Sequence, residues 1–389
     1  MTFDVICVID PRFAGGTAAA MASDINAFLD AGLEVGLVEV KSPYLSDVTE
    51  ARSKAVAKIR EDNRLHVIHD AADRVVKARA AFLHHPMTFF YGLDQPIKLQ
   101  VEKSFMVAHH LPFRGDGSLQ YDPIVTSWRV YRATGAKPIW APVSGICRQQ
   151  LQSFAPLIRL ASQDWPNVFD VSAWTPTREI FTGDHITIGR HGRADLLKWP
   201  KTAAEIAASL PSLPNTRIRV MGAPIAELDA MGVDRSSWTV IPFDAEPVAQ
   251  FLDQLDVFIY HFHPNSSESF GRTVAEAMLM GAVCILDPRL EPTFGDLALY
   301  CLPDETAAMI GRLRADPAAA RSLADRARNS ISARHSIGSV PGRLDDLMAG
   351  KTADNQTEER VVSPLEVLRK TAGMMRRREY FLSQLGARQ

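Results

Sequence analysis

Apolar runs of strand length alternate with helical patterns along most of this chain. The alternation is typical of parallel sheets wrapped by helices, because a parallel pair of strands needs a long crossover between them. A first series of predicted strands covers residues 4–9, 35–40, 66–69, 81–83, 105–109 and 138–141. A second series covers residues 185–189, 217–221, 238–242, 256–262, 283–286 and 299–301. The sequence therefore predicts the α/β class, with two doubly wound Rossmann-like domains that face each other across a cleft.

The two series are separated by residues 165–184, where prolines and turn-forming residues interrupt any regular element. We place the N-terminal domain at residues 1–175 and the C-terminal domain at residues 176–350. A helix is predicted over residues 364–385, and we expect residues 355–389 to return to the N-terminal domain. From residue 351 onward, eight Lys and Arg stand against five Asp and Glu. We favour a solvated helix that packs back on the body; contact with a membrane surface is the alternative.

Composition excludes several classes of protein. The 389 residues carry 43 Lys and Arg against 45 Asp and Glu, a net charge of −2, which gives no global reason to bind nucleic acid. No apolar run reaches the roughly 18 residues that a membrane span requires, and the N-terminus lacks a basic segment followed by an apolar one. We expect a cytoplasmic protein, with the inner face of the membrane as an alternative location.

The scattered cysteines are interpreted as reduced core thiols: Cys7, Cys147, Cys284 and Cys301.

The most informative stretch is residues 256–286, which is typical of a strand, a loop, a helix, a turn and a second strand. Its loop contains the helix-starting residues Ser266, Ser267 and Ser269, and Gly281 follows the helical run, where a left-handed cap is expected. Such a unit puts the helix N-terminus at the carboxyl end of a strand, where open parallel sheets bind ligands. The amides and the dipole of that first turn favour an anion such as a phosphate.

Two carboxylates, Glu268 and Glu276, flank this anion site. They would repel phosphates unless they address other groups, so we assign them to hydroxyls of a sugar and of a ribose, as in a nucleotide-sugar. The alternative is structural: Glu268 favours the helix dipole, and Glu276 pairs with Arg272 four residues earlier. The spacing alone leaves both interpretations open.

Ser-Phe-Gly after Glu268 and Ala-Met after Glu276 resemble the paired-glutamate motif of retaining GT-B glycosyltransferases, specifically glycosyltransferase family 4. The resemblance covers most of the second domain, to about Pro303, and is thin in the first. It implies that Glu268 lies beside the donor sugar and that Glu276 binds the ribose. The residues implied in donor phosphate binding are Phe270, Gly271, Arg272 and Thr273, and Ser269 is expected to bind the donor as well.

Two further segments resemble parts of the same family. Arg190, Arg193 and Lys198 follow a predicted strand and resemble the basic pair that binds the diphosphate. Either arginine suits this role, and we rank Arg190 first because it directly follows the predicted strand. A solvated basic loop is the alternative. Gly15 and Gly16, between the first strand and the first helix, resemble the N-terminal loop that approaches the sugar and phosphate, and they lack the three spaced glycines of an NAD site.

Among the eleven histidines, His109 and His110 end an apolar strand. The family resemblance implies that a histidine there touches the donor sugar; a packed core histidine is the alternative. No metal site is expected, because a metal needs convergent ligands from several elements, whereas adjacent histidines on a strand point to opposite faces.

The resemblance thus implies a retaining hexosyltransferase that moves a sugar from a nucleoside diphosphate sugar to a hydroxyl of a carbohydrate or glycolipid, in polysaccharide or glycoconjugate assembly. The diphosphate would leave on the front face, stabilised by Arg190, Lys198 and the helix amides, without metal or cofactor. Segment 287–296 lacks the family's usual glycine pair and Pro-Glu. Alternatives are a catalytically idle sugar-binding subunit, a nucleotide-sugar epimerase or sugar-phosphate synthase, and a Rossmann oxidoreductase. The donor, the acceptor and the oligomeric state are not predicted.

Overall fold

The computed structural model describes residues 2–45, 51–155, 157–243, 245–350 and 361–380. Its contacts divide the chain into two compact units. Unit 1 comprises Met1–Phe169 with Ile337–Gln389, and unit 2 comprises Asp170–Ser336. The sequence placed the return to the first domain at residue 355. The structure places it at residue 337, because a helix at Val340–Ala349 packs against the first helix of unit 1.

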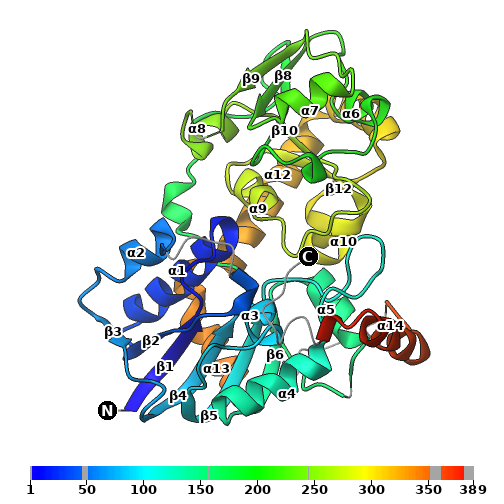
Figure 1. Cartoon of the computed structure of the whole chain (residues 1–389). Coiled ribbons are helices and arrows are strands. Elements are labelled where there is room, and N and C mark those ends of the chain that lie inside the picture. Colours follow the sequence, from blue (N-terminus) through cyan, green and yellow to red (C-terminus); the bar gives the residue numbers. More distant parts are fainter. Residues whose placement is uncertain (1, 46–50, 156, 244, 351–360, 381–389) are drawn as a thin grey trace. The chain divides into compact units, whose positions relative to one another are not determined.

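Unit 1 contains a six-stranded parallel sheet in the order β3-β2-β1-β4-β5-β6 (Figure 1). Its strands are β1 (Thr2–Ile9), β2 (Val35–Glu39), β3 (Leu65–Ile68), β4 (Val75–His84), β5 (Lys98–Ala108) and β6 (Pro138–Pro142). β4 and β5 begin six and seven residues earlier than predicted, at 75 rather than 81 and at 98 rather than 105. Their first halves alternate exposed and buried side chains and therefore lack the continuous apolar run used for the prediction.

Helices cover both faces of this sheet, as the doubly wound class requires. The helices of unit 1 are α1 (Gly15–Asp30), α2 (Lys54–Ile59), α3 (Pro86–Phe90), α4 (Pro123–Thr134), α5 (Gly145–Gln152), α13 (Val340–Ala349) and α14 (Pro364–Arg376). On one face, Phe82 and Phe105 pack with each other and Phe82 packs on Phe28 of α1, with ring centroids 5.1–5.3 Å apart. On the other face, Leu83 and Met106 belong to a core that includes α3.

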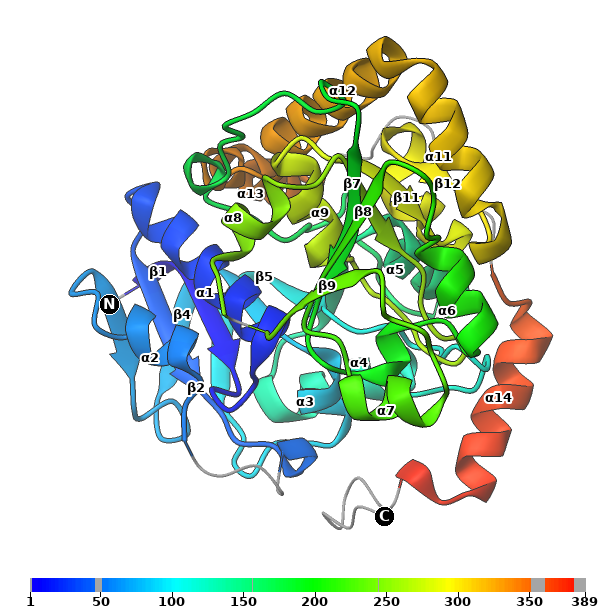
Figure 2. The same cartoon turned by 90° about the horizontal axis from the view of Figure 1, so that it is seen from above.

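Unit 2 contains a second six-stranded parallel sheet, in the order β12-β11-β10-β7-β8-β9. Figure 2 shows β7, β8 and β9 side by side. Its strands are β7 (Ile186–His191), β8 (Thr216–Met221), β9 (Trp238–Ile241), β10 (Val257–Tyr260), β11 (Val283–Leu286) and β12 (Leu299–Tyr300). Its helices are α6 (Ala203–Ser209), α7 (Ile225–Ala230), α8 (Val248–Leu252), α9 (Arg272–Leu279), α10 (Glu291–Phe294), α11 (Thr306–Ala315) and α12 (Pro317–His335). The strand order reverses between β7 and β10, which is the ligand-binding position of such sheets.

The C-terminal helix α14 ends at Arg376, whereas the sequence predicted a helix to Leu385; residues 381–385 lie outside the described residues. Val367 and Met374 of α14 are buried in the core of unit 1, so the helix packs back as expected. All four cysteines are buried and unpaired, which confirms their interpretation as core thiols. Within the described segments, no helix is long and apolar enough to cross a membrane.

Candidate active site

Two loops of unit 2 meet where the strand order reverses. One follows β7 and contains the short 3-10 helix Leu196–Lys198; the other follows β10 and leads to α9. The amide of His263 donates to the carbonyl of Leu197 at 3.2 Å, which joins the two loops directly. The loops that carry Lys198 and Glu268 are therefore brought together at the carboxyl edge of the sheet.

Glu268 is held by a cation and a phenol. Lys198 Nζ lies 2.6 Å from Glu268 Oε2, and the hydroxyl of Tyr260 donates to the same oxygen at 2.8 Å. The side chains of Lys198 and Glu268 are 28% and 16% exposed, so a ligand can reach both. Both of these contacts are made by Oε2. Sequence reasoning missed Tyr260, because a tyrosine inside an apolar strand is typical of the core.

Arg190 does not lie in a loop after the strand, where the sequence placed it. Its strand continues to His191 instead of ending at Gly189, so the Arg190 side chain lies in the interior, 3% exposed, with its guanidinium 4.0 Å from the centre of the Trp199 ring. It donates to the backbone carbonyls of His261 (3.1 Å) and Lys198. Burial lowers the pKa of Arg190 to about 10, so the group remains charged at neutral pH. In this structure Arg190 supports the loop of Lys198 rather than presenting its guanidinium for a diphosphate, whereas Arg193 is exposed.

Helix α9 begins at Arg272, and the residue before it, Gly271, is its N-cap. Gly271 has φ 83° and no side chain to cap the helix. The N-cap position is therefore taken by Gly271 rather than by one of the predicted helix-starting serines, Ser266, Ser267 and Ser269. The first intrahelical bonds run from the amides of Val274 and Ala275 to the Gly271 carbonyl. A Cβ at position 271 would lie 3.3 Å from the Phe294 ring, and the positive φ adds strain for any other residue.

Some residues around this turn are buried in the core, and others are open to solvent. Phe270 is 3% exposed and packs on Phe294 and His335, whereas Arg272 and Thr273 are partly exposed. The expected left-handed residue at the other end of the helix is present, since Gly281 has φ 74°.

Glu276 pairs with Arg272, as the sequence analysis gave for the alternative in which Glu276 has only a structural role. Arg272 Nε lies 2.9 Å from Glu276 Oε1, and His191 Nε2 lies 3.5 Å from Oε2. Burial raises the pKa of Glu276 to about 6, and Arg272 opposes that rise. Burial also lowers the pKa of His191 to about 4, so this imidazole is neutral near pH 7. The contact of His191 was not predicted, because the predicted strand ended at residue 189 and left His191 in the loop that follows.

Arg289 was also missed, although it lies in the segment that departs from the family pattern. Its guanidinium pairs with Asp287 at 2.6 Å and stacks 3.9 Å from the centre of the Phe262 ring. It donates to the Phe262 carbonyl at 2.8 Å and lies 3.3–3.4 Å from the carbonyls of the next part of the loop. Those carbonyls belong to His263, Pro264 and Ser266. Arg289 therefore fixes the loop that ends at Glu268.

On the role beside the donor sugar that the family resemblance implies for Glu268, we expect Arg289→Ala to lower turnover by about tenfold to a hundredfold, since small displacements of a reacting group are costly. The dissociation constant for a nucleoside diphosphate should change far less, because Lys198 and α9 are untouched. Arg289→Lys should recover only part of the turnover, because Lys lacks the planar fork. Steady-state kinetics and calorimetry measure the two effects. Arg326→Ala, which removes an exposed, ion-paired arginine of unit 2, is the control; equal losses in both variants would contradict a positioning role for Arg289.

The predicted residues of unit 1 lie at the carboxyl ends of its own strands. Gly15 and Gly16 begin α1, and Gly15 has φ 64°. The loop before them is fixed by the buried pair of Arg12 and Asp10, with Nη2 and Oδ2 2.7 Å apart. Ser42 also donates its amide to Asp10 Oδ2 at 3.0 Å.

Four histidines gather at the ends of β4 and β5. His109 is buried, and its Nε2 lies 3.0 Å from Nδ1 of His84, while His85 stacks on His110 with ring centroids 5.7 Å apart. Burial, with His110 adding to the effect, lowers the pKa of His109 to about 3. His110 is partly exposed, which makes it the more accessible of the two predicted histidines. The sequence analysis considered only adjacent histidines on one strand, which point to opposite faces. It therefore did not predict this cluster, which is formed between two neighbouring strands. No metal-binding group of three or more suitable side chains occurs in the part of the chain described.

Comparisons with known proteins place the fold in a class. No protein-family model matches the chain, and no curated protein matches it by sequence. The fold is that of GT-B glycosyltransferases, with two α/β units that each carry a six-stranded parallel sheet.

The structure of Anabaena Alr3699/HepE in complex with UDP and glucose is similar with a TM-score of 0.59 and 13% identity, over 90% of this chain and 100% of that one. A glycosyltransferase from Rickettsia africae ESF-5 has a TM-score of 0.58 and 11% identity, over 90% and 98%. WaaG, a glycosyltransferase involved in lipopolysaccharide biosynthesis, has a TM-score of 0.53 and 12% identity, over 89% and 100%.

Proposed function

We propose that this chain is a glycosyltransferase that moves a sugar from a nucleoside diphosphate sugar to a hydroxyl acceptor, with retention at the anomeric carbon and without a metal. The observation that carries the proposal is the grouping of Lys198, Glu268 and the N-terminus of α9 at the reversal point of a Rossmann-type sheet. A fold of this class bound to UDP and glucose in HepE supports the choice of donor. Polysaccharide or glycoconjugate assembly is the setting that we propose for it.

The basic side of the site serves the leaving group. Lys198 and the amides at the start of α9 would bind the diphosphate and stabilise the charge that grows as the bond to the sugar breaks. Their charge is present before the donor arrives, so little rearrangement is needed during the reaction. Arg190 holds the Lys198 carbonyl and therefore acts in this scheme as a positioning residue.

The acidic side serves the sugar hydroxyls. Glu268 uses Oε2 for Lys198 and Tyr260, and we assign Oε1 to a hydroxyl of the donor sugar. Glu276 would accept a ribose hydroxyl while it remains paired with Arg272. The acceptor hydroxyl would attack on the face from which the diphosphate departs, and no covalent enzyme intermediate is required.

The proposal is tested by thermal shift with UDP-, GDP- and ADP-sugars, followed by transfer assays with the donor that binds. Ligand at 100 times its dissociation constant adds about 2.7 kcal/mol of stability, which raises the melting temperature by several degrees. NMR of the product then reports the anomeric configuration, and a chelator should leave the activity intact. A shift with NAD alone, isomerised donor without added acceptor, or activity that a chelator abolishes and a divalent ion restores would each contradict a part of the proposal.

A further inference from the structure

α14 has one face packed into unit 1 and another face that is apolar and exposed. On the packed face, Val367 and Met374 are buried, and the helix is anchored at its end by Tyr380, whose hydroxyl donates to Asp122 Oδ2 at 2.6 Å. Before the helix, the amide of Val362 donates to Ser153 Oγ at 3.1 Å. The orientation of the helix on unit 1 is therefore fixed from both ends.

The opposite face presents large apolar side chains to solvent. Leu365, Leu368 and Met375 are 78%, 62% and 56% exposed. They lie at positions i, i+3 and i+10 with exposed Ala372 at i+7, a spacing that keeps all four on one side of a helix. We call these four residues the apolar stripe. Such a run of exposed leucine and methionine on one helix indicates a contact surface.

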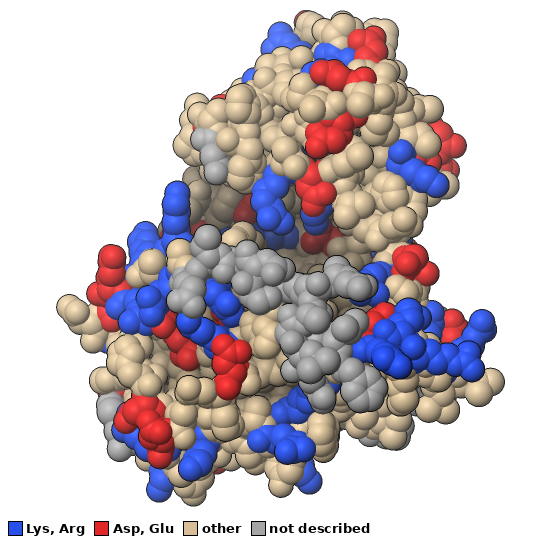
Figure 3. All heavy atoms as spheres, in the orientation of Figure 1, with Lys and Arg blue, Asp and Glu red and all other residues tan. Residues whose placement is uncertain are grey.

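Cations border the stripe. Exposed Arg369 and Arg376 each lie one turn from Leu365 or Ala372 along the helix, on one edge of the stripe. Figure 3 shows Lys and Arg side chains gathered over α14, and segment 361–380 contains five Lys and Arg against two acidic residues. The cations are Arg369, Lys370, Arg376, Arg377 and Arg378, and the acids are Glu366 and Glu379. This excess favours a negatively charged partner.

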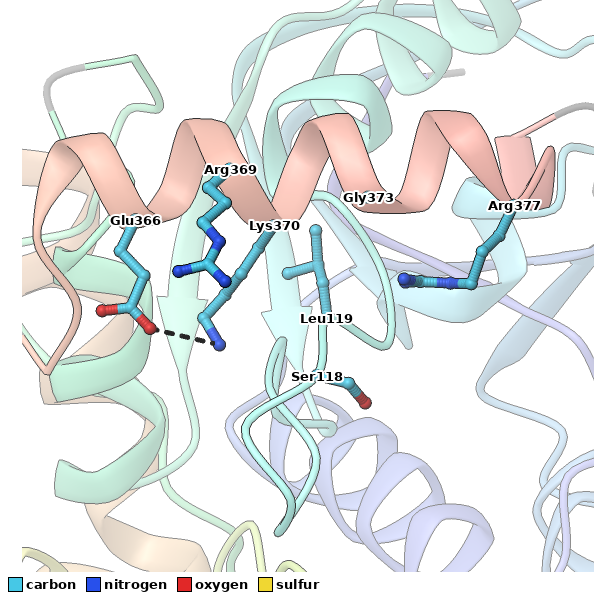
Figure 4. Close-up of a pocket in the computed structure, with 7 residues that line it drawn as sticks. All are labelled: Ser118, Leu119, Glu366, Arg369, Lys370, Gly373 and Arg377. Carbon is cyan, nitrogen blue, oxygen red and sulfur yellow. Dashed lines mark ion pairs between the residues drawn. The ribbon is translucent and has the colours of Figure 1, made fainter.

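A basic cavity lies on the flank of the helix next to this border. It has a volume of about 330 Å³ and is formed between α14 and the loop at Ser118 and Leu119. Figure 4 shows the side chains of Arg369, Lys370 and Arg377 directed toward this side. Lys370 is tethered there by the Gly117 carbonyl and lies 3.4 Å from Glu366. The cavity therefore gathers cationic side chains beside the apolar stripe, where they can meet an anionic group.

We propose that the outward face of α14 docks on an anionic phospholipid membrane, with the apolar stripe in the interface and the bordering cations on the headgroup phosphates. An amphipathic helix with an apolar face and basic flanks has the chemistry that binds such a surface. A symmetric contact between two copies would instead oppose two faces of the same positive charge. The inference concerns unit 1 and does not depend on the donor chemistry of unit 2.

The test is co-sedimentation of the full-length protein with phosphatidylcholine vesicles, alone or with about one-third phosphatidylglycerol, because an anionic lipid surface attracts basic segments. We expect binding to the anionic vesicles, and a large loss of binding near 1 M salt, where the Debye length is about 3 Å. Leu365→Ser and Leu368→Ser should each weaken partitioning by about tenfold, because each removes an apolar side chain from the interface. Arg369→Glu with Arg376→Glu should lower it by more than tenfold.

The matched controls are Leu302→Ser, which changes a 57% exposed leucine of unit 2, and Lys54→Glu with Lys58→Glu on exposed positions of α2. Both should bind as the unchanged protein does. Equal binding to neutral and anionic vesicles, or unchanged binding after the stripe substitutions, would overturn the proposal. So would a dimer in size-exclusion chromatography that Leu365→Ser abolishes while vesicles bind nothing. Vesicle binding with no transferase activity would leave this proposal standing and refute the proposed function alone.

Discussion

Replacing Glu268 by Gln is expected to lower turnover by roughly a hundredfold to a thousandfold, the range for loss of one preorganised electrostatic contact in an active site. The substitution keeps the size of the side chain but removes the charge that we assign to the donor sugar. It also leaves Lys198, now 2.6 Å from Oε2, without its anionic partner. Turnover is measured with saturating donor, and binding of the nucleoside diphosphate is measured by calorimetry.

The affinity of the same variant for nucleoside diphosphate should stay unchanged or increase. A carboxylate near the diphosphate repels it and competes for Lys198, and Gln removes both effects. Glu227→Gln, an exposed acid in the first turn of α7, is the matched control and should change neither quantity. Full turnover in Glu268→Gln would remove this residue from the active site.

Replacing Lys198 by Ala should have the opposite effect on binding. We expect the dissociation constant for nucleoside diphosphate to rise by roughly tenfold to a hundredfold, because a hydrogen bond to a charged group contributes about 1.5–3 kcal/mol. The loss should shrink as the salt concentration rises, since Lys198 is partly exposed and its field is screened. Calorimetry at two salt concentrations measures both changes.

Lys201→Ala is the control for this prediction, because it removes an exposed lysine only three residues along the chain. The Lys198→Ala, Glu268→Gln double variant tests whether the two side chains act together. Their direct contact predicts that the effects on binding are not additive. Unchanged affinity in Lys198→Ala would contradict the assignment of the diphosphate to this loop.

The repeating pattern of the chain was enough to predict the sheets. A predicted strand overlaps each of the strands from β1 to β12. Continuous apolar runs mark central strands such as β1, β10 and β11, because a parallel strand covered on both faces needs them. The pattern underestimated β4 and β5, whose first halves alternate exposed and buried side chains. It also ended β7 two residues early, which placed Arg190 in a loop instead of in the interior.

The contacts of the site were not predictable in the same way. The short spacing from Arg272 to Glu276 was visible in the sequence, and their pair formed as the structural alternative described. The contact between Lys198 and Glu268 joins residues 70 positions apart, and Tyr260 and Arg289 reach the same loop from two different strand ends. Such contacts depend on which strands become neighbours, and no local pattern contains that information.

The sequence by itself determined the α/β class, the two series of strands and the position of Lys198 and Glu268 in loops after strands. These properties follow from local periodicity and from residue types at fixed spacing. Only the tertiary structure decided that Lys198 bonds to Glu268, that Arg190 lies behind them in the interior, and that α14 turns its leucines toward solvent. The physical reason is that sheet order and helix packing set which distant side chains meet and which face of a helix is left uncovered.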